Sequence, residues 1–223
     1  MKIGLINGSP KKKNSASGLL LRELKRLLTK VDSSVIFEEW HLNEKEISSE
    51  QLMQMEDWDR MVFSFPLYVD GIPAHFLTCL QKMEEYLGAR TDQKKPYVYV
   101  MVNAGFYEGH QNRLAIDMIS HWCKKAGCVM GQGMGVGAGG MLSSLEKVPL
   151  GKGPNRNLGK ALQAFAEAMI HQQSTSPVFI NPNFPRIAYR LAAQYNWRVQ
   201  AGKNGLRPKD LSRKPKLYLT GNS

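Results

Sequence analysis

The sequence predicts a doubly wound α/β domain with a five-stranded parallel sheet, followed by a basic helical C-terminal extension. Strand-like and helix-like segments alternate along most of the 223 residues. The strand-like segments are short and almost continuously apolar, which is typical of parallel strands covered by helices on both faces. Basic residues are in excess only near the C-terminal end. We therefore expect residues 1–175 to form the domain and residues 176–223 to form the extension.

The strands and helices of the expected domain follow from composition and periodicity. The third and fourth strand-like segments are rich in aromatic and β-branched residues, which favour strands. Between the strands, apolar residues recur every three or four positions, as on one face of a helix. We expect strands at residues 2–6, 34–40, 60–65, 96–103 and 128–136. We expect helices at residues 17–29, 73–87, 113–125 and 157–171, with a short helix at 50–55.

Composition indicates an ordinary globular protein. Hydrophobic residues make up 43% of the chain and charged residues 22%, enough apolar material for a core without disulfides. The three cysteines, Cys79, Cys123 and Cys128, have no C-x-x-C spacing, so neither a disulfide framework nor a zinc site is indicated. There is no signal-peptide pattern, and no apolar run approaches the roughly 18 residues of a spanning helix. We expect a soluble protein in the reducing cytoplasm.

The net charge of +11 is unevenly distributed. Residues 1–150 carry 18 basic and 17 acidic side chains, whereas residues 181–223 carry nine basic and one acidic. A near-neutral domain argues against a nucleic-acid partner. In the extension, residues 185–195 have a helical stripe of Ile187, Leu191 and Tyr195. This helix is interpreted as packing on the core or on a partner subunit, and the alternative is contact with a membrane surface or a polyanion.

The loop after the first strand has the character of an anion site. Residues 5–21 read "LINGSPKKKNSASGLLL", so a glycine, serines and lysines separate a strand from a helix. Unpaired N–H groups and the helix dipole attract an anion at such a position, and we expect a phosphate. The alternative is that Ser15 or Ser17 only caps the helix and the lysines are solvated. The loop is not a Walker P-loop, because G-x-x-x-x-G-K-[ST] is absent.

Two further loops follow the third and fourth strands, at the same expected edge of the sheet. They read "PLYVDGIPAHF" at residues 66–76 and "NAGFYEGHQN" at residues 103–112. Gly71, Gly105 and Gly109 permit close backbone approach, and the tyrosines and phenylalanine offer stacking faces, so together the loops suit a flat ring. Alternatively, the aromatic side chains only cover the strand ends.

The glycine-rich run "GQGMGVGAGG" at residues 131–140 contains a G-x-G-x-x-G match at Gly135, Gly137 and Gly140. No clear helix–strand unit follows it, and Asn155 stands where a dinucleotide site has a ribose-binding carboxylate. We interpret the run as the fifth strand and its exit loop. Its small residues are expected to admit a ring or a second subunit at the ligand edge.

Together, the three loops resemble those of the flavodoxin-like NAD(P)H-dependent oxidoreductases, a group that includes the NADPH-dependent FMN reductases. The resemblance covers about residues 1–175, and "NPNFPRIAYRLAAQYNW" with "KNGL" is similar to C-terminal extensions of some members. It implies a flavodoxin-like fold. It also implies an FMN phosphate held by Ser9, Lys11, Asn14, Ser15 and Ser17. The isoalloxazine ring would lie between Pro66, Leu67, Tyr68, Val69, Asp70 and Gly71 on one loop and Asn103, Ala104, Gly105, Phe106 and Tyr107 on the other. The triple lysine departs from flavodoxins proper.

The resemblance implies hydride transfer from NADPH or NADH through FMN to a small acceptor such as a quinone, a flavin or a nitro compound. Backbone N–H groups of residues 103–107 are expected to stabilise the reduced flavin. We assign no catalytic acid or base, because Asp70, Glu108 and His110 are interpreted as solvated or loop-stabilising, and no metal is expected. A homo-oligomer, dimer or tetramer, is expected. The alternatives are an electron carrier to protein partners, which is expected to be acidic, and a binding module that uses the basic extension.

Overall fold

The computed structural model describes residues 1–43, 47–90, 94–142 and 148–214. The chain divides into two compact units, Met1–Asn183 and Phe184–Ser223. The boundary that we expected after residue 175 falls before a short strand that belongs to the first unit. The first unit therefore extends to Asn183, eight residues beyond the expected boundary at residue 175.

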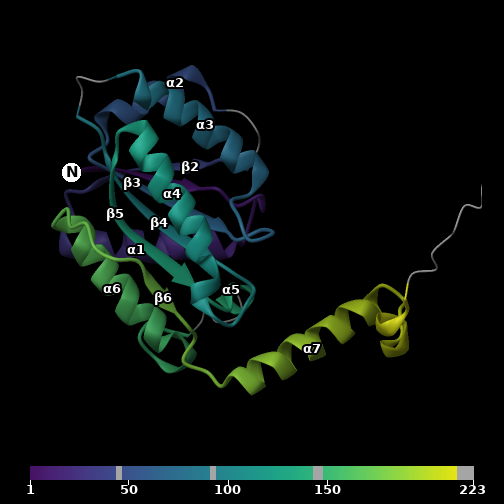
Figure 1. Cartoon of the computed structure of the whole chain (residues 1–223). Helices are drawn as coiled ribbons and strands as arrows, with labels where there is room; N and C mark the ends of the chain where they lie inside the picture. The colour runs from purple at the N-terminus through teal and green to yellow at the C-terminus, as the bar shows by residue number, and fades with distance from the viewer. Residues whose placement is uncertain (44–46, 91–93, 143–147, 215–223) are drawn as a thin grey trace, which may run out of the picture. The chain divides into compact units, whose positions relative to one another are not determined.

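The first unit is built on a parallel sheet (Figure 1). Within the described residues the sheet has six strands in the order β2-β1-β3-β4-β5-β6, and each neighbouring pair is parallel. The strands are β1 (Lys2–Asn7), β2 (Ile36–His41), β3 (Arg60–Pro66), β4 (Tyr97–Asn103), β5 (Val129–Val136) and β6 (Val178–Ile180). The predicted fold class is confirmed, with β6 added to the five expected strands. This strand has only three residues, so its sequence carries too short a pattern to be recognised.

The strand order places a ligand site at one particular position. An order that begins 2-1-3-4-5 is that of the flavodoxin-like doubly wound sheet. The chain leaves β1 toward β2 on one side and continues at β3 on the other, and in sheets of this order ligands bind where the exit loops of β1 and β3 diverge. Those exits are residues 8–15 and residues 67–73.

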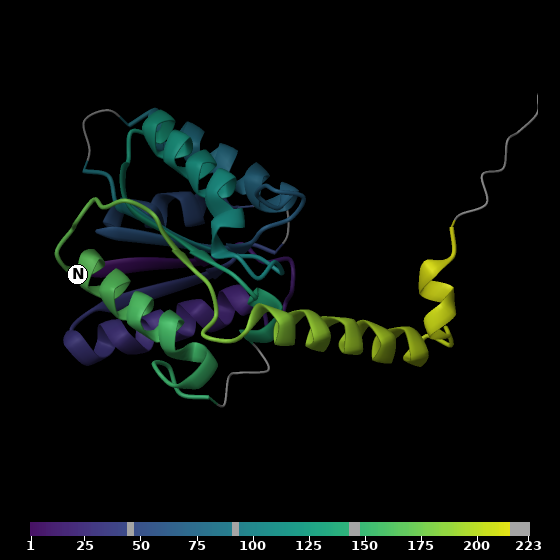
Figure 2. The ribbon, with the colours of Figure 1, turned by 60° about the horizontal axis from the view of Figure 1, so that its bottom comes forward.

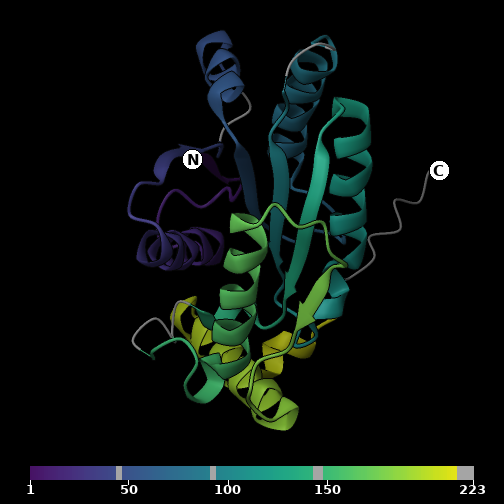
Figure 3. The ribbon, with the colours of Figure 1, turned by 90° about the vertical axis from the view of Figure 1, so that its left-hand side faces the viewer.

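Helices cover both faces of the sheet (Figure 2). Their bounds are α1 (Ala16–Val31), α2 (Ser49–Gln54), α3 (Ala74–Gly88), α4 (Arg113–Ala126), α5 (Gly139–Leu142) and α6 (Arg156–Ile170), with 3₁₀ turns η1 (Met55–Asp57), η2 (Gly109–Asn112) and η3 (Gly153–Asn155). One core cluster contains side chains of α3 and α4, and the other contains side chains of α1 and α6. The strands therefore lie between two helical layers (Figure 3). The four long helices predicted for the domain are confirmed.

Neighbouring residues of the central strands face opposite cores. In β3, Met61, Phe63 and Phe65 belong to the α3–α4 side and Val62 to the α1–α6 side, and all four are fully buried. Such burial on both faces explains why these strands read as continuous apolar runs without alternation. Apolar side chains buried on both faces stabilise the strands. The strand ends to which the loops are attached are therefore held in place.

Two buried polar side chains close the amino-terminal edge of the sheet. Arg60, the first residue of β3, donates from Nε to the carbonyl of Met169 at 2.9 Å, and Tyr99 Oη donates to the carbonyl of Ala168 at 3.1 Å. These carbonyls lie in the last turn of α6, and they also accept from the backbone N–H groups of Gln172 and Gln173, at 3.3 and 2.9 Å. Burial lowers the pKa of Arg60 and raises the pKa of Tyr99 to about 12.

The second unit contains α7 (Arg186–Lys203) and the 3₁₀ turn η4 (Pro208–Ser212). The predicted helix at residues 185–195 exists and continues for two further turns. Asp210 holds η4 together by accepting from the backbone N–H of Arg207 at 2.8 Å and pairing with Arg213 at 3.1 Å. Within the described residues, no helix is long and apolar enough to cross a membrane.

Candidate functional site

Asn7, the last residue of β1, organises the first loop. Its side chain is buried, accepts from the backbone N–H of Ser9 at 3.0 Å and donates to Ser15 Oγ at 3.3 Å. Its amide nitrogen also lies 3.4 Å from Nδ1 of His41, at the end of the neighbouring strand β2. One amide side chain therefore joins both ends of the loop to the sheet. This role of Asn7 was not predicted, although a polar residue at the end of an apolar strand was a usable signal.

Three serines of this region are buried and keep a proton to donate. Ser15 caps α1, and its Oγ accepts from the backbone N–H of Gly18 at 3.0 Å as well as from Asn7. Ser9 Oγ accepts from Lys11 N at 3.3 Å, and Ser17 Oγ accepts from Asn103 Nδ2 at 2.8 Å. Among the described residues none of these hydroxyls has a protein acceptor for its own proton. Since a hydroxyl can donate one bond while it accepts others, the capping role of Ser15 and an anion-binding role are compatible.

The start of α1 adds backbone donors and positive charge. The N–H groups of Ser15, Ala16 and Ser17 have no protein acceptor within the described ranges, as is usual for a first helical turn. Asn14 is exposed and has a φ of 52°, a left-handed conformation that an asparagine tolerates. Lys11 and the next two lysines are exposed. The first loop therefore brings hydroxyl, amide and ammonium donors together within residues 9–17, at the start of a helix.

The second loop is a tight reversal that carries backbone strain. Tyr68 and Gly71 exchange two backbone hydrogen bonds, of 3.1 and 3.0 Å. Between them, Val69 and Asp70 have φ values of 48° and 57°. A β-branched residue in this region is an outlier that costs of order 1–3 kcal/mol, and such strain clusters at functional sites. The Val69 side chain is fully exposed, so its own packing does not repay this cost.

The second and third loops are joined at their bases. Leu67 N donates to the carbonyl of Asn103 at 2.8 Å. The Asn103 side chain donates to the carbonyl of Phe65 at 3.1 Å as well as to Ser17. We expected Asn103 to face the ring, but its amide nitrogen is committed to the protein. Together with Pro66, which ends β3 and is partly buried, these contacts make the bases of the loops part of the sheet.

The third loop is fixed to the exit of β5. Ala104 N donates to the carbonyl of Val136 at 2.9 Å, and Gly139 N donates back to the carbonyl of Ala104 at 2.7 Å. The N–H of Ala104 is therefore not free to stabilise a reduced flavin, contrary to expectation. Tyr107 Oη donates to the carbonyl of Pro182 at 3.4 Å, so this ring is turned toward the exit of β6. Phe106 is 53% exposed.

The glycines near these loops divide into two kinds. A Cβ on Gly105 would meet no atom within 4 Å, and one on Gly71 would meet only carbonyl oxygens at 3.9 Å, so both leave open space as predicted. At Gly109, by contrast, a Cβ would lie 2.5 Å from the backbone of Ile180, and at Gly8 it would lie 2.6 Å from the ring of Phe76. Those two glycines are required by the packing of the protein itself.

The glycine run of β5 also serves internal packing, which corrects our expectation that it admits a ring or a subunit. Tyr99 packs against the backbone of Gly131, and Ile116 packs against that of Gly133, where a Cβ would clash with them. In the same way, the carbonyl of Tyr107 packs against Gly137. Only the position of Gly140 is open among the glycines of residues 131–140. Residues 129–136 form β5, so the interpretation as a fifth strand is correct.

Strained residues concentrate at this edge. Within the described residues, five non-glycine residues have a positive φ: Asn14, Val69, Asp70, Ala138 and Gln172. Four of them follow β1, β3 or β5 at the carboxyl ends of the strands. The hydroxyl of Ser64 in β3 is in addition buried without a hydrogen-bond partner among the described residues. Strain and an unpaired polar atom at one sheet edge make this edge the candidate for a binding site.

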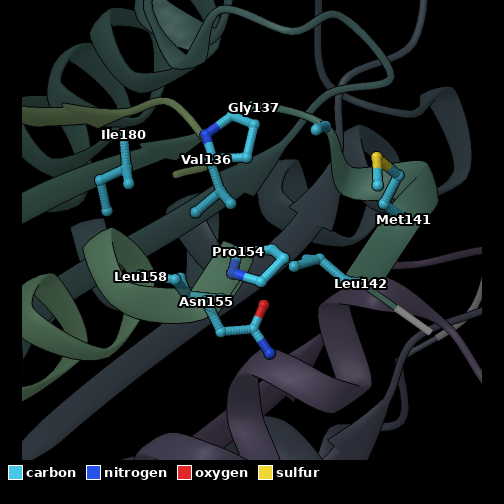
Figure 4. Close-up of a pocket in the computed structure, with 10 residues that line it drawn as sticks. Val136, Gly137, Met141, Leu142, Pro154, Asn155, Leu158 and Ile180 are labelled. Carbon is cyan, nitrogen blue, oxygen red and sulfur yellow. The ribbon is translucent and has the colours of Figure 1, made fainter. Parts of the chain in front are cut away.

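An apolar pocket adjoins this edge beside β5 (Figure 4). Val136 and Ile180 contribute from two neighbouring strands, and Leu142, Pro154 and Leu158 contribute from the helical segments that follow β5. The cavity measures about 20 Å³, which is room for little more than one water molecule. It is not large enough to hold a flavin ring.

The cysteines and His110 have structural environments. Burial raises the pKa of all three cysteines, that of Cys128 to about 11, so they are not poised as nucleophiles. His110 packs edge-on against Phe179 at 4.9 Å, in keeping with a loop-stabilising role. No group of three or more His, Cys, Asp or Glu side chains suited to a metal occurs in the described part of the chain.

Solved structures of low sequence identity share this fold. An azoreductase from Bacillus anthracis str. Sterne aligns with a TM-score of 0.52 at 13% identity, over 76% of this chain and 99% of its own. An NAD(P)H:quinone oxidoreductase from Methanothermobacter marburgensis gives 0.54 at 14% identity, over 74% and 94%. A flavodoxin from Streptococcus pneumoniae TIGR4 gives 0.52 at 10% identity, over 77% and 99%. The sequence matches no protein-family model and no curated protein. The chain therefore has a flavodoxin-like fold.

Proposed function

We propose that the carboxyl edge of the sheet binds FMN and that the protein is an NAD(P)H-dependent oxidoreductase. The observation that carries this proposal is the donor set of the first loop. Ser9, Ser15 and Ser17 are buried and retain hydroxyl protons beside the open start of α1. No carboxylate occurs in residues 8–15. A phosphate monoester dianion fits such a site, because each donor bond to a charged oxygen is stronger than one to a neutral acceptor.

The second and third loops suit a flat ring attached to that phosphate. Tyr68 and Phe106 are about half exposed, and Gly71 and Gly105 leave open space beside them. Their loops share the hydrogen bond between Leu67 and Asn103, so the two sides of the site keep a fixed relation. When bound, FMN supplies hydride transfer between a nicotinamide and an acceptor. The residues of this chain hold the phosphate, orient the ring and leave access for a second planar molecule.

The small acceptor is proposed to be a quinone, a flavin or a nitro compound. The azoreductase and the quinone oxidoreductase reported above support a planar organic acceptor. The second candidate is an electron carrier to protein partners, favoured by the similarity to a flavodoxin at the same TM-score of 0.52. The net charge of +11 favours the enzyme, because we expect a carrier of this type to be acidic.

Cofactor binding is tested by adding FMN and riboflavin separately to the purified protein. The protein should bind FMN, and Ser9→Ala and Ser15→Ala should each weaken FMN binding by roughly 1–3 kcal/mol. Riboflavin lacks the phosphate, so its affinity should change little. Ser34→Ala, which removes an exposed hydroxyl bonded to Asp32, is the matched control. Equal losses for the two flavins, or no flavin binding at all, would refute the phosphate site.

Enzyme and carrier are distinguished by anaerobic mixing of the FMN-loaded protein with NADPH or NADH. An enzyme should lose its flavin absorption within seconds, because hydride transfer needs only stacked rings at roughly 3–3.5 Å. The carrier alternative predicts no bleaching by either nicotinamide and ready bleaching by a small chemical reductant. Azo dye, quinone and nitroaromatic acceptors can then be compared by their rates of flavin reoxidation.

A further inference from the structure

Helix α7 carries a row of exposed apolar side chains. Ile187, Leu191, Tyr195 and Val199 recur every fourth residue, so they follow one side of the helix. Their exposed fractions are 76%, 65%, 71% and 36%. Trp197, on another side, is also 66% exposed. Contiguous apolar surface of this kind on a protein marks an interaction site.

The same unit is strongly basic. Residues 184–223 carry nine basic side chains and one acidic side chain. Helix α7 itself has no acidic residue, and Arg190, Arg198 and Lys203 form no ion pair within the described residues. The single carboxylate, Asp210, is already bonded within η4. A partner that covers this unit must therefore supply negative charge together with an apolar phase.

A second copy of the chain does not meet this requirement. Its acidic residues concentrate around β2 and η1, but these carboxylates already have cationic partners in the first unit. The ion pairs are Glu38 with Lys2, Glu39 with Lys25, Glu56 with Arg90 and Asp59 with Lys94. Two C-terminal units would repel each other through their like charges. The acidic cluster around β2 and η1, as far as the structure describes it, is therefore already neutralised within one copy.

Nucleic acid would supply negative charge, but its outer surface is phosphate and sugar, which take most protein–DNA hydrogen bonds and offer no continuous apolar phase for the row. An anionic membrane surface supplies both the negative charge and the apolar phase. Apolar residues of an interfacial helix enter the boundary between headgroups and acyl chains, and arginines and lysines bind the headgroups. Tyrosine and tryptophan favour the same depth, since one end of each ring is apolar and the other polar.

We propose that α7 binds to the surface of a membrane containing anionic phospholipids. The row from Ile187 to Val199 enters the headgroup boundary, and Arg190, Arg198 and Lys203 bind lipid phosphates. The helix lies in the plane of the surface and does not span it, in agreement with the absence of a spanning helix among the described residues. The FMN site is not needed for this binding, so the inference stands apart from the proposed enzyme activity.

The experiment is co-sedimentation of the full-length protein with vesicles of phosphatidylcholine, alone or mixed with phosphatidylglycerol. The protein should bind the mixed vesicles at least about tenfold more tightly, and Arg190→Glu with Arg198→Glu should abolish that preference. Ile187→Ser with Leu191→Ser should lower binding to mixed vesicles by about tenfold. Emission from Trp197, obtained as the difference from Trp197→Phe, should shift to shorter wavelength on mixed vesicles.

Matched controls lie on the first unit. Leu77→Ser with Leu114→Ser removes two other exposed apolar side chains, and Lys30→Glu with Lys124→Glu reverses two other exposed charges. Both controls should stay within about twofold of the unmodified protein. The proposal is overturned by equal binding to both kinds of vesicle, by an apolar variant that binds as well as the parent, or by tighter binding to duplex DNA. The proposal would also be overturned, in favour of a second copy, if the protein self-associated without vesicles and Ile187→Ser with Leu191→Ser abolished that self-association.

Discussion

The two edges of the parallel sheet are built from the same strands but in opposite ways. At the amino-terminal edge, Arg60 and Tyr99 close the end of α6 with satisfied, buried hydrogen bonds. At the carboxyl edge, Val69 is strained and fully exposed, and buried serine hydroxyls keep unused protons. One edge therefore stabilises the fold, and the other is held in a conformation that suits a ligand. The following variants test this division.

The largest effect is expected at the closed edge. Arg60→Ala removes the shorter of two bonds to the carbonyl of Met169, which keeps only the 3.3 Å bond from the backbone N–H of Gln172, and it opens a cavity. It should therefore lower the free energy of unfolding by about 2–4 kcal/mol. Arg26→Ala, which removes an exposed arginine paired with Glu23 at 2.9 Å, should cost less than about 0.5 kcal/mol. Urea denaturation measures both. Equal losses in the two variants would show that the closed edge has no special role in stability.

Tyr99 should make the same edge sensitive to alkali. Its pKa is raised to about 12 by burial, whereas an unfolded tyrosine loses its proton near pH 10. Between these values the unfolded state is favoured by deprotonation, so stability should fall as pH rises, by up to about 1.4 kcal/mol per pH unit. Denaturation at several pH values from about 9 to 12, with Tyr99→Phe as the reference, measures this contribution. A parallel decline in both proteins would contradict the prediction.

At the open edge, relief of strain should increase stability. Val69→Gly removes a β-branched side chain from a left-handed conformation and should raise the free energy of unfolding by about 0.5–1 kcal/mol. Val31→Gly changes another exposed valine, at the end of α1 and in helical backbone, and should lower it by a similar amount. Thermal melting compares the two. A loss of stability in Val69→Gly would mean that the tight reversal is not strained.

The smallest change in stability is expected at Gly105. A Cβ there meets nothing within 4 Å, so Gly105→Ala should alter the free energy of unfolding by less than about 0.5 kcal/mol. If the proposed ring lies on this backbone, the methyl group should weaken FMN and riboflavin binding to the same extent. Unchanged affinity for both flavins would remove Gly105 from the site. This variant thus separates the open edge from the stability of the fold.

Much of the fold was predictable because the spacing of apolar residues along the sequence reflects which faces of the strands and helices are buried. The continuous apolar run of residues 60–65 indicated a strand buried on both faces, and β3 has that environment. Strand β6 was not predicted, because a segment of three residues is too short to show a periodic pattern of apolar and polar residues. Helix α7 continues past residue 195 through Gly202, a residue that disfavours helix, so the end of this helix had no clear signal.

The candidate site was predictable in its loops and less so in its individual contacts. The position of the first loop followed from a strand, a glycine and a serine-rich helix start. The roles of Asn7 and Asn103 did not follow, because an amide side chain can bond to a ligand or to the protein and only the three-dimensional arrangement selects between them. Likewise, a glycine in a sequence does not reveal what fills its missing side chain, as the packing of Gly137 against Tyr107 illustrates.

The hydrogen bonds that join the third loop to the exit of β5 have a consequence for ligand binding. The amide protons of Ala104, Ala138 and Gly139 are bonded to carbonyls of the opposite segment. They should exchange with heavy water as slowly as the core of the sheet. This wall of the proposed site is then formed during folding, so binding of the proposed flavin should not carry the entropic cost of ordering it.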